Sequence, residues 1–254
     1  MRVLLSNDDG VNAAGLRALA EAFPEDEVWV VAPDREQSAS SHSISLHRPL
    51  RLVEVGPRWL AVDGTPTDAV YVGMNMILRD RKPDVVVSGV NHGPNLGNDV
   101  LYSGTVAAAM EGALLGVPAI AVSLAERPPG DFREAARFAA ALARRVVESR
   151  SPVPLLLNVN VPPGPIRGYR FVRLGRRDYG NEVIEKTDPR GRKYYWIGGE
   201  TGGGHEKHPT TATSCVFEET LVAVTPLGLD LTHDVVIQEL RSWTVPGYRK
   251  EPLL

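Results

Sequence analysis

The sequence has very little cysteine, no long apolar run and no excess of positive charge. Cys215 is the only cysteine in 254 residues, which excludes an internal disulfide and is typical of a reducing compartment. No apolar run reaches the roughly 20 residues that a membrane span needs. Because Met1 leads directly into an apolar segment, we expect no signal or transit peptide. We therefore expect a cytoplasmic protein with no membrane partner.

The balance of charge also excludes a class of partners. The net charge is −3, from 31 acidic and 28 basic side chains, so no overall basic field attracts a nucleic acid polymer. Hydrophobic residues make up 43% and charged residues 23% of the chain, which is typical of a globular protein with a large core. We expect the partner to be a small molecule.

Several common catalytic signatures are missing. The sequence contains no GxxxxGK[ST] phosphate loop, no GxGxxG after its first apolar run and no HExxH zinc motif. It also lacks a Gly-x-Ser-x-Gly elbow, which argues against the nucleophile of an α/β-hydrolase. Any site must therefore be built from other residues.

Strand and helix patterns alternate through the first two-thirds of the chain. Short apolar strands are predicted at 2–6, 28–32, 84–88, 119–123 and 155–159, with helices over 16–23, from Pro66, and over 105–115 and 132–147. Gly56-Pro57, between residues 51–55 and 59–62, indicates an antiparallel hairpin. This alternation predicts an α/β fold with a doubly wound, mainly parallel, Rossmann-like sheet.

The pattern changes beyond Pro162. Strands are predicted at 169–172, 193–196 and 221–225, a helix near 232–243, and no regular structure over 198–209. We divide the chain into an α/β core, 1–162, that carries the metal and phosphate site, and a smaller β-rich part, 163–254. Because small, aromatic-rich β elements need a partner surface, we expect this part to build a homodimer or homotetramer. The alternative is a monomer whose tail folds back on its own sheet.

The most informative motif is Asn7-Asp8-Asp9-Gly10, directly after the first predicted strand. In an open α/β sheet, ligands bind outside the carboxyl ends of the strands. Two adjacent carboxylates repel each other there unless a cation offsets their charge, and a hard ion such as Mg²⁺ or Mn²⁺ suits them. The alternative is that Asp8 caps the following helix and Asp9 is solvated.

A long polar loop from Gly89 to Gly104 is predicted at the same edge of the sheet. Its asparagines offer carbonyl oxygens to a hard cation, and a loop of this length is usually functional or disordered. Ser103-Gly104-Thr105 then opens a helix, whose unpaired N–H groups and positive dipole end suit a phosphate. The alternative is an ordinary N-cap.

A third polar segment, residues 34–43, follows the strand at 28–32. Ser38 could ligate a metal, Arg35 could bind a phosphate bidentately, and His42 could act as an acid or base. Taken alone, the segment is equally typical of a polar surface loop.

Four separated blocks, at residues 3–10, 31–43, 64–68 and 88–97 with the downstream Ser-Gly-Thr, together resemble the SurE (survival protein E) nucleotidases. The resemblance covers most of residues 1–161. It implies a divalent-metal-dependent phosphatase that acts on nucleoside 5′- and 3′-monophosphates, with short polyphosphate as a further substrate. It also carries the family's metal ligands, for one Mg²⁺ or Mn²⁺ per subunit, onto the following residues: Asp8, Asp9, Ser38 and Asn91.

The predicted site combines these segments. Contacts to the substrate phosphate are predicted from Asn95, Ser103, Gly104 and Thr105. Asp8, Asp9 and His42 are the candidate catalytic residues, with His42 the nearby histidine that could protonate the leaving group. A covalent phospho-aspartate on Asp8 or Asp9 stays open.

Other classes of protein share parts of this pattern. A receiver-like signalling module also has an acidic pair after its first strand, but it needs an acceptor Asp where this chain has Ser88-Gly89-Val90-Asn91. Haloacid-dehalogenase-type phosphatases use Asp-x-Asp, whereas Asp8 and Asp9 are adjacent. A nucleotide-binding regulatory module with little turnover stays open as the alternative.

Overall fold

The computed structural model describes residues 1–126, 130–176, 183–197, 208 and 210–249. Its strands are β1 (Arg2–Ser6), β2 (Glu27–Pro33), β3 (Leu52–Gly56), β4 (Trp59–Val62), β5 (Val85–His92), β6 (Ala119–Leu124), β7 (Leu156–Val161), β8 (Tyr169–Phe171), β9 (Val183–Thr187), β10 (Lys193–Ile197) and β11 (Val222–Pro226). Its helices are α1 (Ala14–Glu21), α2 (Pro66–Val72), α3 (Gly104–Leu114), α4 (Arg133–Ser149), α5 (Ala212–Phe217) and α6 (Asp234–Leu240), with a π-helical turn at Gly73–Ile77 and a 3₁₀ turn at Gly97–Leu101.

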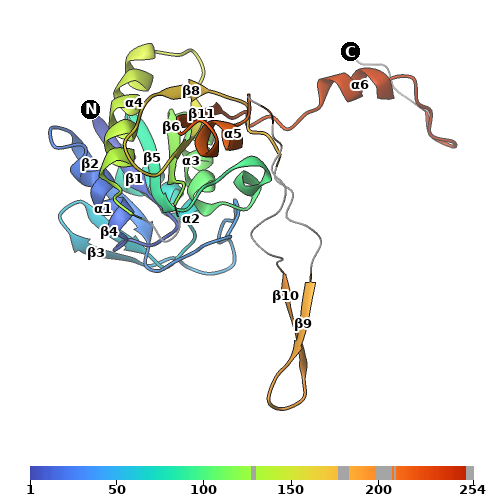
Figure 1. Ribbon diagram of the computed structural model, residues 1–254, viewed down its shortest axis with the longest axis horizontal. Coiled ribbons are helices and arrows are strands. Elements are labelled where there is room, and N and C mark those ends of the chain that lie inside the picture. Colours follow the sequence, from blue (N-terminus) through green and yellow to red (C-terminus); the bar gives the residue numbers. More distant parts are fainter. Residues whose placement is uncertain (127–129, 177–182, 198–207, 209, 250–254) are drawn as a thin grey trace.

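Among the described residues, nine strands form the main sheet in the order β3-β4-β2-β1-β5-β6-β7-β11-β8. The pairs from β4 to β7 are all parallel. β3 runs antiparallel to β4, and β11 runs antiparallel to β7. β9 and β10 form a separate antiparallel hairpin that projects away from the main sheet (Figure 1). The predicted α/β, doubly wound sheet is confirmed.

Alternating side chains on the strands build a core on each face of the sheet. Val3 and Leu5 of β1 face the helices α1 and α4, whereas Leu4 between them faces α2 and α3. Because both faces are covered (Figure 1), the central strands are mostly apolar, as parallel strands usually are. The polar residues at their carboxyl ends therefore stand out as an exception.

Helix α3 packs very closely on the sheet because its side chains are small. A Cβ on Gly112 would come within 2.8 Å of Val86 on β5, so only glycine allows this approach. Ala108, Ala109 and Ala113 are buried in the same core. The position of the helix start, where a phosphate site is predicted, is thereby fixed against β1 and β5.

Two predicted segments differ from the structure. β5 continues to His92, so the loop predicted to start at Gly89 begins four residues later, and Gly97–Leu101 forms a 3₁₀ turn within it. The positive φ of Gly89, +132°, and a change of register after Ser88 allow the strand to go on beside β6.

The β-rich part is only partly separate from the α/β core. β8 and β11 extend the main sheet, so residue 162 marks a change of sequence pattern and not the end of that sheet. Strand β9 and helix α5 were not predicted. Of the segment 198–209, predicted to lack regular structure, only His208 lies within the described residues. No helix in the described ranges is both long and apolar enough to cross a membrane.

Candidate active site

The turn after β1 presents two carboxylates at the carboxyl edge of the sheet. The side-chain amide of Asn7 donates to the carbonyl oxygen of Gly10 at 2.9 Å and closes the turn. Gly10 has a φ of +101°, and a Cβ there would lie 3.1 Å from the backbone carbon of Arg35. The turn therefore needs glycine, and it leaves Asp8 and Asp9 at the edge.

Asp8 is packed against the first turn of α3. The hydroxyl of Thr105 donates to Oδ1 of Asp8, and a Cβ on Gly104 would lie only 2.7 Å from Cβ of Asp8 and 3.0 Å from its Oδ2. Burial raises the pKa of Asp8 to about 6, against the lowering effect of the Thr105 hydrogen bond, and the charge of Asp9 raises it further. The charged form of Asp8 is thus disfavoured unless a cation lies nearby.

Asp9 faces the end of the neighbouring strand β5. Its Oδ1 lies 3.7 Å from Nδ1 of His92, whose ring stacks on Phe132 with the centroids 5.0 Å apart. The preceding residue, Asn91, is buried, and its Nδ2 donates to the carbonyl oxygen of Gly93 at 2.7 Å. This contact leaves the carbonyl oxygen of the Asn91 side chain as the atom for a ligand.

These residues fit a hard cation. In the described part of the chain, no three His, Cys, Asp or Glu side chains gather as a metal-binding group. The edge instead offers the oxygens of two carboxylates and one amide, which are ligands that Mg²⁺ and Mn²⁺ prefer. A divalent ion there would also offset the buried charge of Asp8.

The serine-rich segment after β2 lies against this edge. The backbone N–H of Gln37 donates to the carbonyl oxygen of Asp8 at 2.7 Å. Ser38, the predicted ligand that follows, is exposed, and its hydroxyl donates to Glu36 at 2.8 Å. The buried hydroxyl of Ser40 instead points at the start of α3, 2.9 Å from where a Cβ of Gly104 would lie. Ser40 was not predicted as a site residue.

Further contacts bind the serine-rich segment to α3 and to the turn that precedes it. Ser41 donates through its backbone N–H to Tyr102 at 3.1 Å and through its hydroxyl to the carbonyl oxygen of Leu101 at 2.7 Å. Nε2 of His42 lies 2.9 Å from Oε2 of Glu111. Because helical side chains lean toward the N-terminus of their helix, the carboxylate of Glu111 is directed toward the end of α3 where Gly104 lies.

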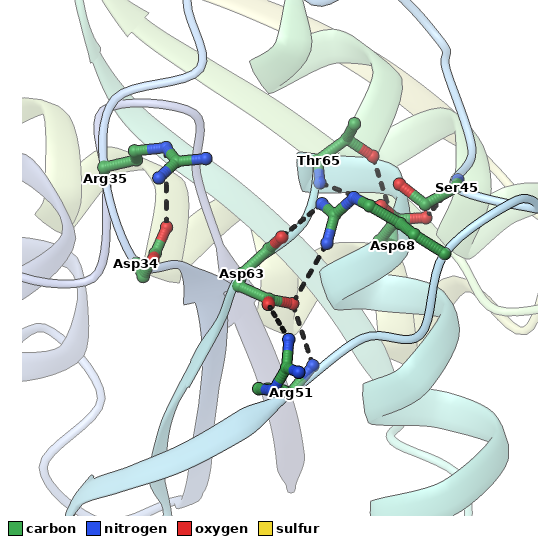
Figure 2. A network of polar contacts seen from close by, with 8 residues as sticks. Asp34, Arg35, Ser45, Arg51, Asp63, Thr65 and Asp68 are labelled. Atoms are coloured by element: carbon green, nitrogen blue, oxygen red, sulfur yellow. Dashed lines mark hydrogen bonds and ion pairs between the residues drawn. The ribbon is translucent and has the colours of Figure 1, made fainter.

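A polar network binds the residues that follow the serine-rich segment to the start of α2. Figure 2 shows Asp68 receiving the backbone N–H groups of Ser45 and Thr65, at 2.8 and 2.9 Å. Asp63 pairs with Arg51 in the same view. Thr65 caps α2, which begins at Pro66 as predicted. Arg35, a candidate phosphate ligand, is exposed and lies beside Asp34, at 3.9 Å (Figure 2).

The predicted phosphate end is built on Ser103, Gly104 and Asn95. Ser103 caps α3 by accepting the backbone N–H of Val106 at 3.1 Å, and its hydroxyl proton stays available to a second partner. Asn95 is buried, and its Nδ2 donates to Ser123 at 2.8 Å. Thr105 gives both its hydroxyl and its backbone N–H to the carboxylate of Asp8, so the backbone N–H of Gly104 is the donor that this helix start offers to a phosphate.

The comparisons identify the family. A family model described as survival protein SurE matches residues 3–181. The chain belongs to the SurE family. A SurE relative from Anaeromyxobacter dehalogenans (strain 2CP-C), named 5′-nucleotidase SurE, is 79% identical over 252 residues and 99% of both chains. Another of that name, from Myxococcus xanthus (strain DK1622), is 56% identical over 99% of this chain and 97% of its own.

A solved structure of a SurE protein has the same fold. The crystal structure of the SurE protein from Aquifex aeolicus superposes with a TM-score of 0.84 at 39% sequence identity, and the match covers 95% of this chain and 98% of that one. The resemblance inferred from the four sequence blocks is confirmed.

Proposed function

We propose that this protein is a divalent-metal-dependent nucleotidase. It hydrolyses nucleoside 5′- and 3′-monophosphates to nucleoside and phosphate, and it takes short polyphosphate as a further substrate. The observation that carries the proposal is the contact between the carboxylate of Asp8 and the first turn of α3, because it joins a cation site to a phosphate site. The name of the relatives, 5′-nucleotidase SurE, supports the same activity.

One Mg²⁺ or Mn²⁺ per subunit would be held by Asp8, Asp9, Asn91 and Ser38. Such an ion supplies electrostatic stabilisation of the charge on the phosphoryl group. Ser38 would hold the ion once its hydroxyl gave up the hydrogen bond to Glu36, a small change in an exposed segment. Ser40 supplies a second hydroxyl at the same end of α3.

The protein's own groups bind and orient the phosphate. The backbone N–H of Gly104 at the start of α3 and the hydroxyl of Ser103 donate to its oxygens. Asn95 adds the second proton of its side-chain amide, because only one is donated to Ser123. Donors fixed in this way stabilise the transition state without reorganising during the reaction.

His42 is the proposed proton donor to the leaving ribose oxygen. Glu111 holds its Nε2 and thereby orients the ring. In the imidazolium form Nδ1 also carries a proton, and this is the proton that reaches the leaving group. Neutralising an alkoxide in this way is worth roughly 10²- to 10⁴-fold in rate.

The substrate is a small nucleotide and not a polymer. The net charge of −3 provides no field for a nucleic acid, and the buried surroundings of Asp8 suit a single phosphate group. A receiver-like module without turnover is not favoured, because Ser88 and Asn91 occupy the strand end where its acceptor carboxylate would stand.

The working unit is a cytoplasmic homodimer or homotetramer. Every residue of β9 and β10 is exposed in the single chain, including Tyr194, Tyr195 and Trp196, and α6 buries no side chain. Figure 1 shows both elements standing away from the main sheet. Apolar surface of this kind supports a contact with another copy of the chain.

A panel of phosphate esters assayed with Mg²⁺, Mn²⁺ or EDTA tests the proposal. We expect nucleoside monophosphates to release phosphate with either metal and EDTA to abolish this release. Asp8→Asn and Asp9→Asn should be nearly inactive. Full activity after exhaustive chelation, or preference for duplex DNA or RNA over mononucleotides, would overturn the proposal.

A further inference from the structure

Two asparagines interrupt the apolar strand β7 near its carboxyl end. Asn158 and Asn160 are both completely buried, two residues apart and hence on the same face of the sheet. In the sheet register Asn160 lies opposite Ser123 of β6, and Asn158 lies opposite Thr225 of β11. Burying an amide is costly unless it is hydrogen-bonded, so the partners of these two side chains indicate their role.

Both amides bind one backbone unit, that of Asn95. Nδ2 of Asn158 and Nδ2 of Asn160 donate to the carbonyl oxygen of Asn95 at 2.9 and 3.0 Å. Oδ1 of Asn160 accepts the backbone N–H of Asn95 at 2.8 Å. Oγ of Ser123 completes the set by accepting a hydrogen bond from Nδ2 of the Asn95 side chain at 2.8 Å.

Asn95 lies in the connection between the metal end of the site and its phosphate end. It is four residues past Asn91 and eight before Ser103, and the residue after it, Leu96, is buried in the core beneath α5. Three side chains from two neighbouring strands therefore fix both the backbone and the side-chain amide of Asn95. Without them, this loop residue would be free to rotate.

We propose that Asn158, Asn160 and Ser123 form an asparagine clamp that positions Asn95 for the phosphate. The inference rests on the proposed nucleotidase function and deepens it. The clamp holds the Asn95 backbone and one amide proton, so that the second amide proton faces the phosphate oxygens. These three are positioning residues, because they act on the substrate only through Asn95.

A purely structural role would have different consequences. Leucine branches at Cγ as asparagine does and would suit an apolar strand, so sheet stability alone does not require two amides here. Partners that orient the ligands of a metal typically matter roughly 10- to 100-fold in affinity or activity, and we expect an effect of the same order for partners that orient a phosphate ligand. The clamp should therefore act on turnover in protein that remains folded.

The decisive experiment compares Ser123→Ala, Asn158→Leu and Asn160→Leu with wild type on a nucleoside monophosphate. We expect kcat/KM to fall roughly 10- to 100-fold while the circular dichroism spectrum and a cooperative melt are retained. Thr225→Val is the matched control, because Thr225 is buried beside Asn158 and makes no bond to Asn95. Its kcat/KM should equal that of wild type.

A double-mutant cycle tests whether the clamp acts through Asn95. In an Asn95→Ala background, Ser123→Ala should have no further effect on kcat. Full additivity, or wild-type kinetics in folded Ser123→Ala, would overturn the proposal. If a leucine variant does not fold, Ser123→Ala decides alone, since it removes only one hydroxyl.

The assay also separates this inference from the proposed function. If wild type releases no phosphate from any nucleotide, the nucleotidase function fails. The clamp is then judged by calorimetric binding of inorganic phosphate, which should be weaker in Ser123→Ala than in wild type. Equal binding by both proteins, or binding by neither, would reject the clamp as well.

Discussion

Thr105 donates its hydroxyl proton to Oδ1 of Asp8 and so ties the start of α3 to the end of β1. The two residues are 97 positions apart in the chain. The bond orients the carboxylate, and it fixes the distance between the carboxylates and the helix N-terminus before any ligand binds. The site is therefore as rigid as the contact between this helix and the sheet.

The contact leaves no room for a side chain at Gly104. In Gly104→Ala the new Cβ would lie 2.7 Å from Cβ of Asp8 and 2.9 Å from Oγ of Ser40, so the carboxylate or the helix must shift. We expect kcat/KM to fall by roughly 10² or more, the effect of a displacement near 1 Å. Gly228→Ala is the control, because a Cβ there meets nothing within 4 Å. Unchanged kinetics in folded Gly104→Ala would mean that this helix start is only a cap.

The raised pKa of Asp8 predicts a pH-dependent cost of its charge. With a folded pKa of about 6 against an ordinary 3.8, the buried carboxyl stabilises the fold below pH 4, and this contribution is lost as the pH rises through 6. Without metal, Asp8→Asn should therefore raise the free energy of unfolding by roughly 3 kcal/mol at pH 8. The difference should vanish near pH 4.

Urea unfolding in EDTA at both pH values measures this effect. Asp34→Asn is the control, since Asp34 is exposed and its replacement should leave the difference between pH values unchanged. Adding Mn²⁺ should reverse the order of stability at pH 8, because only the wild type keeps the full set of carboxylates. A pH-independent difference would show that burial does not disfavour the Asp8 charge.

The His42–Glu111 pair predicts a dependence on the leaving group. His42→Gln and Glu111→Gln should each lower kcat on a nucleoside monophosphate by roughly 10², and the double variant should be little worse, because the two residues act as a unit. On p-nitrophenyl phosphate, whose leaving group needs no proton, the loss should be small. Exposed His47 provides the control His47→Gln. Equal losses on both substrates would indicate that the pair shapes the pocket and transfers no proton.

The exposed hairpin predicts the mass of the protein in solution. Light scattering at micromolar concentration should give two or four times the 27.6 kDa of one chain. Trp196→Asp, in β10, should shift this mass toward the monomer because it places a charge in the contact. Leu46→Asp, at an exposed loop residue of the α/β part, should leave the mass unchanged. A monomeric wild type would refute the oligomer.

The sequence was most informative at the carboxyl ends of the parallel strands, where the topology of the sheet determines which residues lie together. Asp8 and Asn91 could be placed together because each ends a buried parallel strand, and such ends share one edge of the sheet. The start of α2 at Pro66 was equally legible, because a proline at the first position of a helix is a local signal.

Partners that meet only after packing were not predictable. Glu111 sits in an alanine-rich helix, and nothing local indicates that His42 will reach it. Asn158 lay inside a correctly predicted strand, but its partner, Asn95, is 63 residues away. The one available signal was a polar residue within an apolar strand. It indicates a buried hydrogen bond but does not identify the partner.

The place of β11 between β7 and β8 has a consequence for how the chain is completed. β8 precedes β11 by about fifty residues, yet it has no partner in the sheet until β11 arrives. During synthesis β7 therefore presents an open edge, with unpaired backbone groups, until residues 222–226 leave the ribosome. A chain cut short before Val222 would therefore keep the carboxylates of Asp8 and Asp9 and yet expose the edge of β7, which would be prone to aggregation.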